Sequence, residues 1–149
     1  MFPYTAVGYV QVSSDWVATP DVLIRQIEKR IRSYKPSEIT VDAASILFHA
    51  GLLRLVSAKN LLAPISRGLI EVSAQDTGLI VSYKLWFSEV IIAGTLMSMT
   101  FAVWSQTHSI SPLVVFLVFW VWFVGGSYTV GVVLFRSMLK KASLGLRPS

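Results

Sequence analysis

Charge is almost absent from one long stretch of the chain, and this stretch limits the possible folds more than any other feature. Between Lys84 and Arg136, Glu89 is the one acid or base apart from His108. A transmembrane helix takes about 20 apolar residues, so this window of about fifty residues has room for two such helices.

A polar run at residues 105–109 divides the window in the middle. We therefore expect a two-helix transmembrane hairpin over residues 85–135, with spans at about 85–105 and 112–135. Both spans are expected to be helices, because the hydrocarbon layer holds no water to satisfy free backbone groups.

The composition indicates the same class of protein. Hydrophobic residues make up 54% of the 149 residues and charged residues 14%, whereas charged residues are about a quarter of an ordinary soluble domain. Cysteine is absent, which excludes a disulfide-stapled module and any zinc, iron–sulfur or redox site built on Cys. We expect a small membrane protein.

Lysine and arginine flank the window but are missing from the loop between the two spans. Lys84 precedes the first span, and Arg136, Lys140 and Lys141 follow the second. The positive-inside rule then predicts that both termini lie in the cytoplasm, with the chain in the cell inner (plasma) membrane. Residues 136–149 are predicted to be a basic cytosolic tail.

The ends of the spans carry residues that are typical of a membrane interface. Ser88 is expected to cap the first helix, with Glu89 in its positively polarised first turn. Ser111 and Pro112 are expected to begin the second helix. Amphipathic rings favour the headgroup level. The predicted interface anchors are Trp86, Glu89, Trp104, Arg136, Lys140 and Lys141.

Residues 1–84 carry most of the charge, in mixed sign, as a folded cytosolic domain would. Thr19-Pro20-Asp21 has the pattern of a helix start, and Pro36 is expected to end that helix. Between them, apolar residues recur at helical spacing. They are Leu23, Ile24, Ile27, Ile31 and Tyr34.

Other segments of this domain alternate between apolar and polar residues, which predicts strands. They are residues 7–12 and 38–42, and a hairpin of 68–73 with 79–85, which is the strongest strand signal; residues 45–49 follow the second of these segments. Residues 52–62 are ambiguous and fit a short helix. We expect an α+β domain with one amphipathic helix on a three- to four-stranded antiparallel sheet. Its last strand runs into the first span without a linker, so the domain is expected to be held rigidly at the membrane surface.

Small residues recur on one face of each span, which lets helix backbones approach closely in lipid. The predicted helix-packing residues are Gly94, Ser98 and Ala102 in the first span, and Gly125, Thr129, Ser127 and Gly131 in the second. Packing of the hairpin on itself and packing against a partner both stay open. A set of large aromatic residues predicts a face toward lipid or a partner: Phe116, Phe119, Trp120 and Phe123.

The sequence shows no catalytic set, so we expect no catalytic, cofactor-binding or metal-ligating residues. His49 and His108 are both expected to be ordinary polar residues, because a metal site needs three or four ligands. Glu89 is expected to cap the helix or anchor it at the interface, with proton or ion handling as the alternative. No stripe of basic and aromatic residues indicates nucleic-acid binding.

We expect a non-catalytic, integral-membrane accessory or scaffold subunit at the periphery of a larger membrane protein complex, such as an energy-transducing one, with its domain docked on the cytosolic face. The expected partners are other integral membrane subunits and lipids, and a homo-oligomer stays open. One alternative is a self-assembling small channel or holin-like pore former, although a pore normally has a polar or charged lining. Another is a membrane-anchored cytosolic binding or sensing module.

Overall fold

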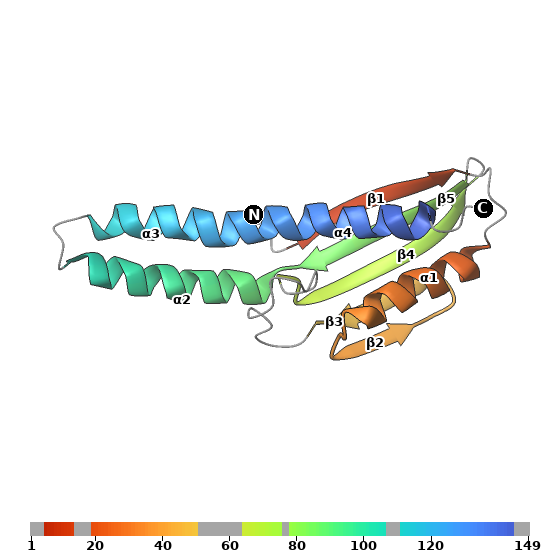
Figure 1. Cartoon of the computed structure of the whole chain (residues 1–149), viewed down its shortest axis with the longest axis horizontal. Coiled ribbons are helices and arrows are strands. Elements are labelled where there is room, and N and C mark those ends of the chain that lie inside the picture. Colours follow the sequence, from red (N-terminus) through yellow and green to blue (C-terminus); the bar gives the residue numbers. More distant parts are fainter. Residues whose placement is uncertain (1–4, 14–18, 51–63, 76–77, 107–110, 145–149) are drawn as a thin grey trace.

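The molecule is elongated, with a helix hairpin at one end and a β-sheet at the other (Figure 1). The computed structural model describes residues 5–13, 19–50, 64–75, 78–106 and 111–144. The ambiguous segment at 52–62 and His108 lie outside the described residues, so what the sequence predicts for them stays a prediction.

A five-stranded, fully antiparallel sheet forms the framework of the sheet end. Its spatial order is β1-β5-β4-β3-β2. The strands are β1 (Thr5–Ser13), β2 (Glu38–Val41), β3 (Ser45–His49), β4 (Arg67–Gln75) and β5 (Gly78–Trp86). The predicted hairpin of residues 68–73 with 79–85 is confirmed as β4 and β5.

The expected count of three to four strands was too low, because both the N-terminal segment and residues 45–49 join the one sheet. The N-terminal segment forms the edge strand β1. It pairs with β5 over its whole length, from Thr5 opposite Trp86 to Ser13 opposite Gly78. Long-range pairing of this kind depends on the partner strand, and the alternation in one segment does not reveal it.

Helix α1 (Pro20–Ser33) begins and ends where the sequence predicts. Pro20 occupies its first turn, where a missing N–H costs nothing. Its apolar stripe is buried on the sheet and consists of Leu23, Ile24, Ile27 and Ile31. Past its end, Lys35 has a φ of 53°, and Pro36 prevents the helix from continuing.

The hairpin is built from α2 (Ser88–Ser105), α3 (Pro112–Trp120), a π-helical turn η3 (Val121–Gly125) and α4 (Gly126–Leu144). Phe87 alone separates β5 from α2. The last three elements follow each other without a break. Within the described residues, two helices are long and apolar enough to cross a membrane, Ser88–Ser105 with 18 residues and Pro112–Ser143 with 32.

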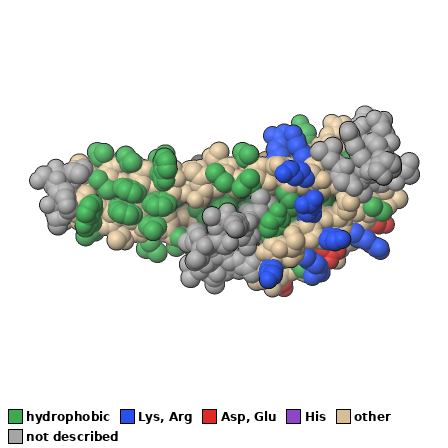
Figure 2. Space-filling view, viewed as in Figure 1, with side chains coloured by type: hydrophobic (Ala, Val, Ile, Leu, Met, Phe, Trp, Pro, Cys, Tyr) green, Lys and Arg blue, Asp and Glu red, His purple; other side chains and the backbone are tan. Residues whose placement is uncertain are grey.

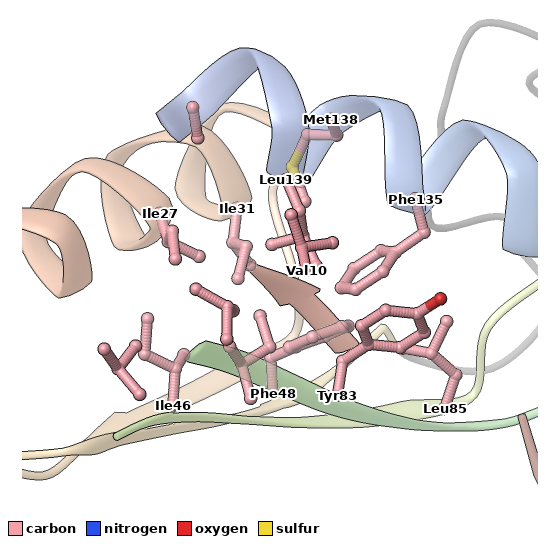
Figure 3. Close-up of a cluster of buried hydrophobic side chains, with 14 of the residues drawn as sticks. Val10, Ile27, Ile31, Ile46, Phe48, Tyr83, Leu85, Phe135, Met138 and Leu139 are labelled. Atoms are coloured by element: carbon pink, nitrogen blue, oxygen red, sulfur yellow. The ribbon is translucent and has the colours of Figure 1, made fainter. Parts of the chain in front are cut away.

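The second of these helices is longer than a membrane requires, and its end joins the core of the sheet end. At about 1.5 Å per residue it is about 50 Å long, against a hydrocarbon core of about 30 Å. Its surplus residues Phe135, Met138, Leu139 and Ala142 are buried in one cluster with the sheet. Figure 3 shows Phe135 and Met138 above Val10 and Tyr83.

Two helices therefore cover one face of the sheet, α1 and the end of α4 (Figure 3). The ring of Phe135 lies 6.1 Å from that of Phe48 and 5.5 Å from that of Tyr83, centroid to centroid. The predicted boundary at residue 135 falls inside α4, which continues to Leu144. A domain of about eighty residues can form only a small core by itself. The end of α4 enlarges this core, because it packs beside α1 on the same face of the sheet.

Candidate functional site: the helix hairpin and its junction with the sheet

The small residues of α2 face the returning helix. Gly94 and Ser98 are both buried. A Cβ placed on Gly94 would lie 2.6 Å from Cγ2 of Val124. The hydroxyl of Ser98 donates to the carbonyl oxygen of Gly94 at 2.7 Å, so it needs no polar partner on the other helix. Gly94 and Ser98 therefore serve the packing of the hairpin on itself.

The small residues of the returning helix differ in how deeply they are buried. Gly131 is buried at the junction, where an added Cβ would lie 2.9 Å from both Phe87 and Pro64. Thr129 is exposed and donates to the carbonyl of Gly125 at 2.9 Å. Gly126 has no atom within 4 Å of an added Cβ. Ser127 and Ala102 are half-buried, so only part of the predicted stripe is fully buried.

Two of the four residues of the predicted aromatic face contact α2. Phe119 stacks on Phe101 with centroids 4.2 Å apart and planes inclined by 7°. The indole N–H of Trp120 donates to the hydroxyl of Thr95 at 3.1 Å. That hydroxyl in turn donates to the carbonyl of Ile91 at 2.7 Å. No pattern in the sequence indicates Phe101 or Thr95, because each pairing depends on how the two helices are aligned.

Phe116 and Phe123 are half-buried, and Phe123 also lies beside Phe119, with centroids 6.0 Å apart. Trp122 is the aromatic residue that the π-helical turn η3 directs outward, with 76% of its surface exposed. π-Helical turns add a residue to the helix and change which side chains share a face. An open apolar groove runs along η3 and the adjoining turns of α3 and α4. Its lining includes Val121, Trp122, Gly126, Thr129 and Val130.

The outer surface of the hairpin is apolar and carries no charge over most of its length. Figure 2 shows hydrophobic side chains over the hairpin end and Lys and Arg over the sheet end. Among the large exposed side chains are Ile92, Leu96, Met97, Met99 and Val103 on α2, and Leu113, Val114, Leu117 and Val118 on α3. An exposed apolar area of this extent marks an interaction surface for lipid or protein.

A serine from the loop before β4, and not the expected Ser88, satisfies the start of α2. The backbone N–H of Glu89 donates to the hydroxyl of Ser66 at 3.2 Å. Ser88 is already the first residue of the helix, and its hydroxyl lies 3.1 Å from that of Ser66. The backbone of Ser66 donates to the carbonyl of Trp86 at 2.8 Å, so this one residue ties the loop to both β5 and α2.

The other predicted anchors lie at three levels along the molecule. Trp86 and Glu89 are half-buried at the junction between β5 and α2. Trp104 is 62% exposed near the far end of α2. Three cations are exposed on the part of α4 that packs on the sheet: Arg136, Lys140 and Lys141.

Beyond the hairpin, a pocket of about 410 Å³ lies between α1 and the end of α4. Its lining includes Lys29, Arg30, Ser33 and Lys141. Three cations around one pocket favour an anionic ligand.

His49 ends β3 and is half-buried, opposite Arg67 in the register. Across the described ranges, no three His, Asp or Glu side chains gather in a group that could hold a metal ion. No family model, curated protein or solved structure matches the chain. The described part of the chain offers apolar packing surfaces on the hairpin and basic surfaces on the sheet end.

Proposed function

We propose that this protein is a non-catalytic integral-membrane subunit, of the accessory or scaffold type, that holds a folded domain rigidly against the cytosolic face of a larger membrane protein complex. One observation carries the proposal: a single uninterrupted helical segment passes from the apolar hairpin into the core of the sheet. The single residue between β5 and α2 forms a second rigid connection. A domain on a flexible tether would need neither the continuous helix nor the one-residue connection.

The proposed placement puts the hairpin in the cell inner membrane and both termini in the cytoplasm. Its support is the distribution of charge, because basic residues are found on both sides of the hairpin in sequence and are missing from the loop within it. The two arms of the hairpin lead back to the same sheet, so β1 and the end of α4 lie at the same end of the hairpin (Figure 1).

Two surfaces are available to partners. The first is the apolar exterior of the hairpin around Trp122, which suits other integral membrane subunits and lipids. The second is the edge strand β1, which pairs with β5 and carries no charged residue between Thr5 and Ser13. Val7 and Tyr9 are 73% and 68% exposed on it. Long, uncharged edge strands are prone to pair with another chain.

One alternative has an observation in its favour. The basic pocket beside Lys29, Arg30 and Lys141 suits a membrane-anchored binding or sensing module that takes an anionic ligand. A small channel or holin-like pore former is the remaining alternative. Several copies of the chain would have to assemble to line such a pore.

Site-specific photo-cross-linking in native membranes tests the proposal. We place a photoreactive amino acid at Trp122, on the exposed face of the hairpin, and in a matched control at Asp21, which is exposed at the start of α1. The expected result is a cross-link from position 122 to another integral membrane protein, with little from position 21. A monomer in every mild detergent, with no cross-link at 122, would contradict it. Cross-links to the chain itself alone would favour a pore, which ion flux through liposomes then tests.

A further inference from the structure

Two cations share one indole ring where the sheet meets the hairpin. The guanidinium carbon of Arg67 lies 5.4 Å from the centroid of the Trp86 ring, and the ammonium nitrogen of Lys84 lies 5.1 Å from it. Both contacts follow from the sheet register. Arg67 is directly opposite Trp86 on the paired strands β4 and β5, and Lys84 precedes Trp86 by two residues on the same face.

This face of the sheet is the one that α1 and α4 leave open. Tyr83 and Leu85 alternate with Lys84 and Trp86 along β5 and are buried in the core below the two helices. The side chains of Lys84 and Trp86 therefore point to the opposite face. Arg67 and Lys84 are exposed, and Trp86 is half-buried.

Among the described residues, no carboxylate forms an ion pair with either cation. The ion pair recorded among the described residues joins Arg32 to Glu28 on α1, and none with an N–O distance within 4.0 Å involves Arg67 or Lys84. Like charges held beside one ring repel each other. An anion placed between them would relieve the repulsion, and a guanidinium can bind a phosphate through two parallel hydrogen bonds.

We propose that Arg67, Lys84 and Trp86 form a binding site for the phosphate of an anionic phospholipid headgroup. The site rests on the proposed insertion of the hairpin in the membrane. Trp86 is separated from the first residue of α2 by Phe87 alone, so the ring and both cations lie where the hydrocarbon would begin. Indole rings prefer this headgroup level, and basic side chains there are attracted to anionic lipid.

Lipid titration by native mass spectrometry of the full-length chain in mild detergent tests the site. The probes are a phosphatidylglycerol and a phosphatidylcholine with the same acyl chains. Wild type is expected to prefer the anionic lipid. The double variant R67Q/K84Q is expected to lose about 30-fold in affinity for it, at about fivefold for each cation. Trp86→Leu keeps both charges and is expected to lose less.

The matched control is R25Q/K35Q, which also removes one Arg and one Lys. Both residues are exposed on or just after α1, across the sheet from the proposed site. This control is expected to keep the wild-type affinity. The proposal is overturned if R67Q/K84Q binds phosphatidylglycerol as wild type does, or if the control loses as much. If inorganic phosphate at an equal concentration displaces the lipid, the site binds free phosphate, and the proposal of a lipid site is contradicted.

Extraction of native membranes with alkaline carbonate separates this inference from the proposed function. If the chain is released, the membrane proposal fails and this site fails with it. If the chain stays in the membrane while lipid affinity is unchanged in R67Q/K84Q, the site alone is contradicted.

Discussion

At the scale of single residues, the close approach of the two long apolar helices depends on Gly94. Lipid tails are as apolar as the helix surfaces, so burial of apolar area gives no driving force there and close packing supplies the attraction. Gly94 lets Val124 sit against the backbone of α2. Valine has little rotational freedom in a helix, so its Cγ2 cannot move aside to accept a larger neighbour.

Gly94→Ala is therefore expected to lower the thermal stability of the purified protein in detergent. Alanine favours a helix over glycine by about 1 kcal/mol, but overpacking costs about 1–3 kcal/mol. Gly126→Ala is the matched control, because nothing lies within 4 Å of an added Cβ there, and it is expected to be neutral or stabilising. Equal melting temperatures for the two variants would show that Gly94 makes no close contact.

At the scale of elements, the sheet and α1 could be predicted from the sequence, and the role of α4 was only partly visible. Alternation marked the strands and helical spacing marked α1. The charges after position 135 alone predict a basic tail. Phe135, Met138, Leu139 and Ala142 also recur at helical spacing, which is a signal of a buried helix face. Attention to that spacing would have indicated a core helix in place of a tail.

Other features could not be predicted from one sequence. Ser66 satisfies the start of α2 from more than twenty residues away, and no local spacing connects it to Glu89. The contact of Trp120 with Thr95 depends on the alignment of two helices. Both features arise from tertiary packing, which local patterns do not contain.

The packing of α4 on the sheet gives a prediction for this element. Phe135→Ala is expected to cost about 3–5 kcal/mol of stability, because a fully buried ring is lost from the core. Helicity should be retained, since alanine is the best helix former. The neighbouring Leu134→Ala, at a position 46% exposed, is expected to cost less than about 1 kcal/mol.

Denaturation followed by near-ultraviolet circular dichroism, with far-ultraviolet spectra for helicity, measures the stability of both variants. If Phe135→Ala and Leu134→Ala unfold alike, α4 does not belong to the core of the sheet.

At the scale of the whole molecule, the apolar and charged halves are joined into one elongated body. The hairpin exposes apolar side chains at one end, and the sheet end carries the basic residues (Figure 2). The helical segment that begins at Pro112 belongs to both halves. A force applied to the hairpin would therefore reach the sheet through a continuous helix.

Single-cysteine labelling tests the membrane arrangement of this body, and the absence of native Cys gives every variant one thiol. Cysteine replaces Gln106 at the loop end of the hairpin, Leu117 on α3, Asp21 on α1 or Ser143 on α4. A membrane-impermeant maleimide is expected to label position 106 in intact cells, positions 21 and 143 only after permeabilisation, and position 117 only after denaturation. Labelling of position 117 in intact membranes as fast as position 21, or labelling of 21 and 143 from opposite sides, would contradict the proposed hairpin.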